Sequence, residues 1–430
     1  MFFSLTKLAI GGIVAWCFFW LITPVDVVGH VAPGAMIYIV VCYIFLLLGA
    51  LYGHRHLAPT AQGGEPDGPL WQEPLRLRLF LGSVTIGLFG MAMRLFDRLY
   101  LRGAQYGGNA LEFRDSLANS DVSTVGAIAS ALYPFCLLPL LILLASGDGL
   151  KRRGLLILAI VVFCLPMAES LFQLSRSFLI MTMGLAFATI VITHYRGNPF
   201  NRKLLSIAIG GLVVIAFLST AIFSARLEAG AGHLSDSVFD SVYADYLQPN
   251  NRAREAINSG SETEVIYYNA ILPNGMYYMS GVYEVSVLWD RPDGQRFAYG
   301  QLLFLPFVRG LALVVDRDMM TGFDIQNYVY RDGVFQTFFG PLWVDFGWFG
   351  PLFMALFGFL FQRLAVAVRQ GSIAWLPLYA FLSIVVFFMP VVNLLVSGFG
   401  MFCVIAFALF AFYARPARRK PEPQLVGVAT

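Results

Sequence analysis

Residues 33–52 read PGAMIYIVVCYIFLLLGALY, an apolar stretch that contains no charged side chain. A helix needs about 20 residues to cross the hydrocarbon core of a bilayer, which is roughly 30 Å thick. The whole chain of 430 residues is 58% hydrophobic and only 13% charged, and its mean hydropathy is +0.70. Such a composition is typical of proteins whose solvent is lipid. The stretch therefore predicts a membrane-spanning helix, and the composition predicts further spans.

Similar apolar runs recur along the chain. They lie near 8–24, 33–52, 79–93, 122–145, 154–170, 177–193, 204–223, 341–361, 372–389 and 391–413. The runs lack the alternation of a barrel strand, and backbone amides in lipid must be satisfied within a helix. We predict an all-α polytopic membrane protein of about ten transmembrane helices. Seven spans fall in residues 1–223, a large helical loop occupies 224–340, three spans occupy 341–413, and residues 414–430 form a tail.

Basic residues gather in alternate short loops, which must lie on one side of the membrane. They are Lys7, Arg55, Arg76, Arg78, Lys151, Arg152, Arg153, Arg196, Arg202, Lys203, Arg363, Arg369, Arg415, Arg418, Arg419 and Lys420. The positive-inside rule makes this side cytoplasmic, with both termini inside and the large loop outside. The inner side then has a net charge of +11 and the outer side −8. Because the outer face is acidic overall, no nucleic-acid partner is expected.

The large loop is rich in aromatic residues, mostly tyrosine, which is not the composition of a disordered segment. We expect it to fold onto the membrane, with aromatic rings that either stack on sugars or form the core of the loop. Within it, residues 302–315 are apolar but are interrupted by Pro306 and Arg309. This stretch is too short for a span and predicts a re-entrant or interfacial helix.

Three arginines follow the third span. Arg94, Arg98 and Arg102 stand at i, i+4 and i+8, so a regular helix would place them on one face at the outer membrane surface. One interpretation is a cradle for a pyrophosphate or an acidic sugar. The other is that the arginines reach out to lipid headgroups.

A second polar stripe lies between the fifth and sixth spans. Glu169, Gln173 and Arg176 stand at i, i+4 and i+7 in otherwise apolar sequence. Ionisable groups at this depth usually face a cavity, although the stripe could equally pair with another span. If the helix breaks after Pro166, only Arg176 keeps its position, at the head of the next span.

Further candidates lie where the large loop meets the membrane. Arg309 and Arg331 are placed where the headgroup of a lipid-linked substrate would rest. Asp345 enters the membrane between two tryptophans, and partial burial could adapt it to work as a general base. The alternative is a carboxylate paired to a loop arginine. Other acidic candidates are Glu284, Asp316, Asp318 and Asp332.

Several catalytic signatures are missing from the sequence. It contains no phosphate-binding glycine loop, no HExxH and no GxSxG. The five cysteines all fall within predicted spans and show no metal-ligand spacing. We therefore expect neither a metal nor a cofactor.

Three short stretches resemble the Wzy-type polymerases, membrane enzymes that polymerise O-antigen and related glycans. The first is FDRLYLRG at 96–103, similar to the Asp/Arg segment that follows an early span in that family. The second is YGQLLFLPFVR at 299–309, although many members place the proline directly before the arginine. The third is GVFQTFF at 333–339, which leads into DFGWFG at 345–350. The related O-antigen ligases carry a His-Asn pair where this chain has Gln336 and Thr337.

The resemblance implies a metal-independent glycosyltransferase with a GT-C-like fold in the bacterial inner membrane, active on the periplasmic face. It would polymerise repeat units carried on undecaprenyl pyrophosphate, and a chain-length regulator would be a further partner. The residues expected to act in catalysis are Asp345, Arg176 and Arg309. Those expected to bind substrate are Arg94, Arg98, Arg102, Glu169, Arg331 and Tyr299.

Three alternatives to a polymerase remain open. One is an O-antigen ligase. Another is a transporter or flippase for a lipid-linked or anionic solute, although no internal repeat is visible in the sequence. The third is a membrane anchor or sensor that binds partners through its large loop.

Overall fold

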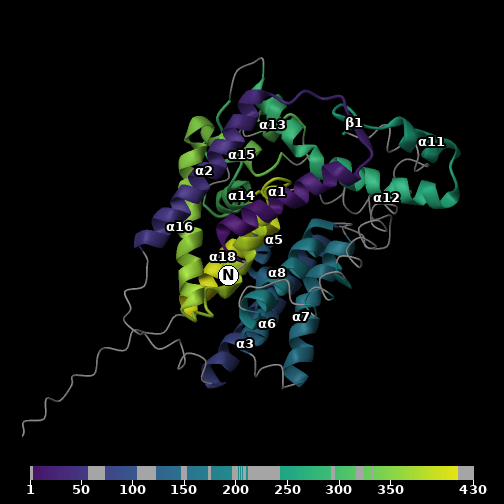
Figure 1. Ribbon diagram of the computed structural model, residues 1–430. Coiled ribbons are helices and arrows are strands. Elements are labelled where there is room, and N and C mark those ends of the chain that lie inside the picture. The colour runs from purple at the N-terminus through teal and green to yellow at the C-terminus, as the bar shows by residue number, and fades with distance from the viewer. Residues whose placement is uncertain are drawn as a thin grey trace, which may run out of the picture.

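The computed structural model describes residues 3–56, 73–103, 123–146, 153–172, 176–195, 202, 204, 206, 210–211, 243–291, 296–315, 324–331, 334 and 336–414. The regular secondary structure in these regions is helical, apart from one antiparallel pair of short strands (Figure 1). The strands are β1 (Val25–Val27) and β2 (Leu247–Pro249), with Asp26 opposite Gln248.

Six described segments are long and apolar enough to cross a membrane. They are Leu5–Ile22, Pro33–Arg55, Leu75–Leu101, Thr124–Ser146, Arg153–Leu171 and Phe339–Arg369. These six segments match the predicted runs at 8–24, 33–52, 79–93, 122–145, 154–170 and 341–361. The protein is thus all-α and suited to cross a membrane several times, as the composition predicts.

The first half of the chain supplies five of these segments. Its elements are α1 (Leu5–Ile22), α2 (Pro33–His56), α3 (Glu73–Phe96) with the π-helical turn η2 (Asp97–Leu101), α5 (Thr124–Leu132), the 3-10 turn η3 (Tyr133–Leu137), α6 (Leu138–Ser146), α7 (Arg153–Phe172) and α8 (Arg176–His194). The predicted span at 204–223 lies almost entirely outside the described residues.

The second half begins with the folded part of the predicted loop. It contains α11 (Asn251–Ser259), α12 (Glu262–Met279), α13 (Gly281–Trp289), α14 (Leu305–Val314) and the 3-10 turn η6 (Ile325–Asn327). Then follow α15 (Phe339–Phe346), the 3-10 turn η7 (Gly347–Phe349), α16 (Gly350–Arg369), α17 (Leu376–Phe388) and α18 (Gly398–Tyr413). The helix predicted within 302–315 is therefore present as α14.

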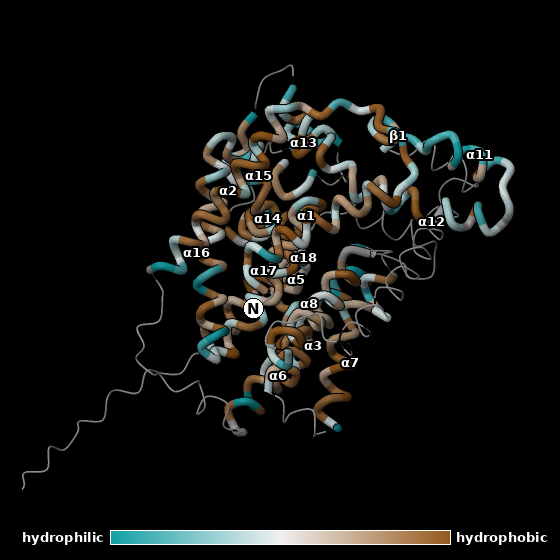
Figure 2. The backbone as a smooth tube through the Cα atoms, in the orientation of Figure 1, coloured by the Kyte–Doolittle hydropathy of each residue, from teal (hydrophilic) through white to brown (hydrophobic). Residues whose placement is uncertain are grey.

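Helices α2 and α16 lie side by side, and glycines allow their close approach (Figure 1). A Cβ atom at Gly49 would overlap the carbonyl oxygen of Ala355, and one at Gly358 would overlap that of Leu46. Small residues serve the same purpose in other membrane helix pairs, where van der Waals packing replaces the hydrophobic drive. Figure 2 shows hydrophobic shafts for α3, α7 and α16, with hydrophilic residues at their lower ends.

The folded part of the loop has a core of its own, formed largely by its aromatic residues. The ring of Tyr246 stacks on that of Tyr283 at 5.3 Å, and both side chains are buried. Tyr278 stacks on Phe19 of α1 at 4.6 Å, which attaches the loop to the helices below it. Several loop tyrosines therefore serve as core, the second of the two roles that the composition left open.

Helices α17 and α18 are shorter than the predicted runs at 372–389 and 391–413 because a buried, non-helical connection separates them. Helix α17 ends at Phe388, just before Pro390, and α18 begins only at Gly398. The connection is satisfied within the protein: Met389 accepts from the backbone N–H of Phe338 at 2.9 Å, and Asn393 accepts from that of Leu395 at 3.0 Å. Irregular backbone among membrane helices is tolerated where protein or a cavity surrounds it.

Candidate functional site

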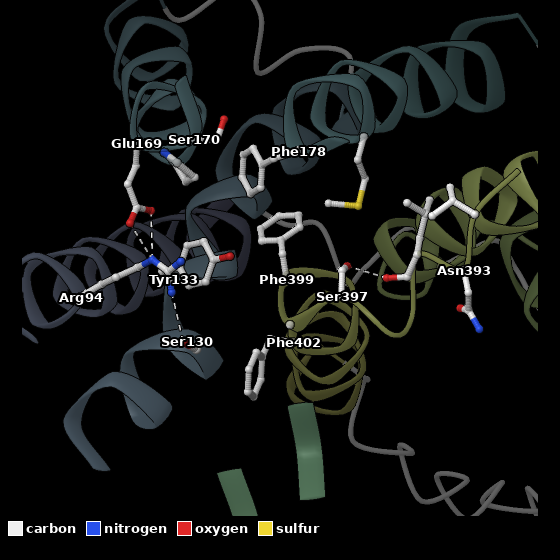
Figure 3. Close-up of a pocket in the computed structure, with 15 residues that line it drawn as sticks. Arg94, Ser130, Tyr133, Glu169, Ser170, Phe178, Asn393, Ser397, Phe399 and Phe402 are labelled. Atoms are coloured by element: carbon white, nitrogen blue, oxygen red, sulfur yellow. Dashed lines mark hydrogen bonds and ion pairs between the residues drawn. The ribbon is translucent and has the colours of Figure 1, made fainter. Parts of the chain in front are cut away.

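A cavity of about 340 Å³ lies where α3, α5, α7, α8 and the start of α18 meet (Figure 3). Its lining residues are Arg94, Ser130, Tyr133, Pro166, Glu169, Ser170, Phe178, Met181, Val392, Asn393, Leu394, Ser397, Gly398, Phe399 and Phe402. One wall is charged and hydroxyl-bearing, whereas Phe178 and Phe399 meet on another at 3.9 Å between ring centroids. A cavity with few polar groups in an apolar surround is the usual form of a ligand site.

Two glycines of α3 bring the charged wall together. A Cβ atom at Gly87 would lie 2.5 Å from the backbone nitrogen of Cys136, and one at Gly90 would lie 2.5 Å from that of Tyr133. Only glycine permits α3 to approach the η3 turn so closely. As a result the guanidinium of Arg94 lies 4.3 Å from the centre of the Tyr133 ring, in a cation–π contact.

Glu169 joins two arginines at this wall. Arg94 donates from Nε to both carboxylate oxygens, at 2.8 and 3.0 Å, and from Nη1 to the hydroxyl of Ser130 at 3.0 Å. Arg98 forms an ion pair with the same carboxylate. The side chains of Glu169 and Arg98 are 5% and 9% exposed, so this charge cluster is buried within the helical segments. Ionisable side chains buried among membrane-spanning helices usually have a functional role.

Arg102 pairs with a different carboxylate from the one that binds Arg94 and Arg98. The end of α3 winds into the π-helical turn η2, and the backbone N–H of Arg102 bonds to the carbonyl of Asp97, five residues earlier. The Nε of Arg102 lies 2.9 Å from a carboxylate oxygen of Asp97. That carboxylate also accepts from the hydroxyl of Ser123, the N-cap residue of α5. π-Helical turns of this kind are frequent at functional sites.

The charge cluster is defined here as Arg94, Asp97, Arg98, Arg102 and Glu169. Three guanidiniums face two carboxylates, so the cluster has a net charge of +1. An anion in the cavity would compete with Glu169 for the guanidinium of Arg94, because both side chains line the cavity.

The predicted stripe of Glu169, Gln173 and Arg176 is only partly visible. Helix α7 ends at Phe172 and α8 begins at Arg176, and Gln173 lies outside the described residues. The backbone position of Arg176 is given at the head of α8, but its side chain is not among those described. Glu169 both lines the cavity and pairs with Arg94 of α3, so it fits both of the readings that the sequence left open.

Arg309 lies on α14, which packs against α18 and α5 behind the cavity wall. Its side chain is exposed, and among the residues that the structure describes it makes no hydrogen bond or ion pair. A Cβ atom at Gly310 would lie 3.9 Å from the ring of Phe402, a lining residue. Arg309 is thus an exposed cation on a helix that contacts the cavity wall, and it does not itself line the cavity.

Asp345 is 1% exposed, and both of its carboxylate oxygens bind backbone N–H groups. Oδ1 accepts from Leu302 at 3.0 Å and Oδ2 from Leu303 at 2.6 Å. Tyr299 precedes this turn with φ of +52°, followed by Gly300 at +90°. The ring of Tyr299 is 82% exposed and does not line the cavity. The base role of Asp345 and the binding role of Tyr299 stay predictions.

Arg331 belongs to a separate cluster in the folded loop. Its guanidinium lies 2.8 Å from Glu284 and 3.2 Å from Asp245, and it stacks over the ring of Tyr246 at 4.6 Å. Burial raises the pKa of Glu284, and the neighbouring guanidinium of Arg331 opposes this rise. Burial likewise raises the pKa of Tyr283 to about 12. This cluster ties together three parts of the loop, and none of its residues lines the cavity.

Sequence reasoning missed five polar residues of the cavity, namely Ser130, Tyr133, Ser170, Asn393 and Ser397. A signal was available for two of them, because Ser130 and Asn393 are isolated polar residues within predicted spans. For metals, the described residues include no group of three histidine, cysteine, aspartate or glutamate side chains placed to hold an ion.

Comparison of the chain with protein-family models, curated proteins and solved structures found no match.

Proposed function

We propose that the protein is a membrane glycosyltransferase that polymerises oligosaccharide repeat units carried on undecaprenyl pyrophosphate, the activity that the sequence resemblance implies. The observation that carries the proposal is the buried charge cluster, two of whose residues, Arg94 and Glu169, line an otherwise largely apolar cavity. A pyrophosphate joined to a lipid combines the two properties that this cavity could bind, namely negative charge and apolar bulk.

The proposal includes the finer topology: ten spans, both termini cytoplasmic, and a GT-C-like arrangement in a bacterial inner membrane. The basic ends of α3, α7 and α16 all point toward the bottom of Figure 2, whereas Arg94 and Glu169 lie toward the opposite ends of α3 and α7. By the positive-inside rule, the cavity then opens in the outer half of the membrane, where lipid-linked repeat units would be joined.

The reaction would use the cluster as follows. A hydroxyl oxygen of the acceptor sugar attacks the anomeric carbon of the donor, and the bond from that carbon to the pyrophosphate oxygen breaks. The leaving pyrophosphate takes the electron pair, and Arg94 and Arg98 stabilise its charge, with Arg309 as a further cation. As phosphate oxygens take over the guanidiniums, the carboxylate of Glu169 is released and accepts the proton of the hydroxyl. Asp345 is the other candidate for this base.

The test uses a strain that lacks the gene and carries variants expressed at normal level, with lipopolysaccharide separated on a gel. Deletion should replace the ladder by core bearing a single repeat. Arg309→Ala removes an exposed side chain, so we expect normal protein and loss of the ladder. Arg94→Lys keeps the charge but loses the planar fork that binds two oxygens at once, and should also lose the ladder.

Arg363→Ala is the matched control, because it also removes an exposed arginine, but one that lies near the C-terminal end of α16, outside the cavity lining. This variant should keep the ladder. An unchanged ladder in the deletion strain would refute the polymerase. The readout must be extended to capsular and exported polysaccharide, because the sequence does not identify the glycan.

A transporter or flippase is the second candidate, and the broken α17–α18 pair favours it. Irregular backbone between two short helices at a cavity is a feature of transporter binding sites, and Asn393 and Ser397 line the cavity there. The same gel separates the candidates. Loss of a flippase would leave bare core, because no repeat unit would reach the outer face. Loss of a ligase would also leave bare core, so that result would require a transport assay to choose between them.

A further inference from the structure

Asp345 is a carboxylate fully engaged by backbone. It stands near the end of α15 with 1% of its surface exposed, and its two oxygens accept from consecutive N–H groups of Leu302 and Leu303 at 3.0 and 2.6 Å. A third bond, from the N–H of Ala298 to the carbonyl of Val344 at 3.0 Å, fastens the same turn to the same helix. Asp345 does not line the cavity.

The turn that Asp345 holds needs such a clamp. Tyr299 and Gly300 both adopt positive φ, and only glycine does so without strain. Helix α14 starts two residues after the turn, at Leu305, with Pro306 in its first turn. The orientation of α14 is therefore set where Leu302 and Leu303 are fixed.

Helix α14 in turn supports the cavity wall. A Cβ atom at Gly398 would lie 4.0 Å from Cβ of Pro306, and one at Gly310 would lie 3.9 Å from the ring of Phe402. Gly398 and Phe402 both line the cavity. Arg309, next to Gly310, is carried on the same helix.

We infer that Asp345 is a positioning residue, whose carboxylate clamps residues 302–303 and thereby seats α14 against α18 with Arg309 beside the cavity. This positioning role replaces the general-base role that the sequence predicted for Asp345. The consequence for the reaction rests on the proposed function, whereas the seating of α14 does not.

The seating can be measured with a disulfide. Two Cβ atoms 4.0 Å apart are within the range of about 3.5–4.5 Å that a disulfide requires, so Pro306→Cys and Gly398→Cys should crosslink α14 to α18. The exposed native cysteines Cys17 and Cys164 are replaced by serine. A protease site inserted at the turn between α16 and α17 lies between the two positions, so the fragments stay joined after cleavage only if the disulfide has formed.

In the purified protein, Asp345→Ala should slow crosslinking by roughly tenfold or more, the factor expected for one lost hydrogen bond to a charged acceptor. Asp345→Asn keeps an oxygen acceptor and should crosslink at a rate between those of the parent and the alanine variant. Crosslinking as fast in the alanine variant as in the parent would overturn the inference, whatever the activity of the protein.

Measurement of chain extension then distinguishes a positioning role of Asp345 from a role as general base. Asp345→Ala should lose the ladder while reduced and regain it once the disulfide holds α14, and Asp345→Asn should retain much of the ladder without a disulfide. If Asp345 were the general base, both variants would lose the ladder and no crosslink could restore it. Loss of the ladder in both variants with or without the disulfide would therefore also overturn the inference. The parent carrying only Pro306→Cys is the control for the substitution itself.

Discussion

Replacing Glu169 by alanine should destabilise the protein more than removing either arginine that binds it. The carboxylate is 5% exposed and faces Arg94 at 2.8 Å, with Arg98 paired to the same oxygen. The charge cluster has a net charge of +1; Glu169→Ala makes it +2, whereas Arg98→Ala makes it neutral and leaves the bond from Arg94 intact. Removing one partner of a buried pair costs about 3–5 kcal/mol when the remaining charge is uncompensated.

We therefore expect Glu169→Ala to lower the free energy of unfolding by about 3–5 kcal/mol. Arg98→Ala should cost about 1–2 kcal/mol less, since the carboxylate keeps its hydrogen bonds from Arg94. The double variant should be more stable than the sum of the two single losses predicts, because both the carboxylate and one of the two repelling cations are gone.

The assay is equilibrium unfolding in detergent, followed by tryptophan fluorescence, on the parent, both single variants and the double variant. Glu169→Gln is the matched control, because it keeps the shape and an acceptor oxygen but removes the charge. If Glu169→Ala cost no more than Arg98→Ala, the carboxylate would not hold the two arginines together, and the balance of charge argued here would be refuted.

Two further predictions concern other parts of the protein. Gly358→Ala should weaken the packing of α2 against α16 and lower the midpoint of thermal unfolding, since its Cβ would overlap the carbonyl of Leu46. Gly82→Ala is the control, because nothing lies within 4 Å of its Cβ position, and it should leave the midpoint unchanged. Equal midpoints for the two variants would contradict the close packing. Arg331→Met should cost about 3–5 kcal/mol at neutral pH by leaving Glu284 buried without its cation. Burial already raises the pKa of Glu284 above the ordinary 4.5, so the loss of stability in Arg331→Met should grow as pH rises past the pKa of Glu284 and shrink below it. A loss of stability that is independent of pH between 4 and 8, or no recovery of stability on adding Glu284→Gln, would show that the carboxylate is not the cause.

The apolar runs could be read from sequence because bilayer thickness fixes the length of a spanning helix. Runs such as 33–52 and 154–170 accordingly became α2 and α7. The same reasoning overestimated 372–389 and 391–413, because hydropathy does not register a buried connection whose backbone is satisfied inside the protein. Pro390 was the available signal.

The candidate site was less accessible to sequence. Helical spacing brought out Arg94 and Arg98, but it did not reveal the π-helical turn at Asp97 or the pairing of Arg102 with Asp97. Residues close in sequence could be related by such spacing. The pairing of Arg94 with Glu169 spans 75 positions and could not.

Composition and charge therefore determined that this protein is all-α, suited to the membrane, and equipped with arginines at the ends of its helices. Tertiary structure alone decided which of these arginines meet a carboxylate, which of them stay exposed, and where a cavity remains. The reason is physical: burial in lipid selects residue types that a sequence displays directly. The approach of α3 to η3 depends on glycines and ring shapes on separate helices, and those contacts exist only after the helices have packed.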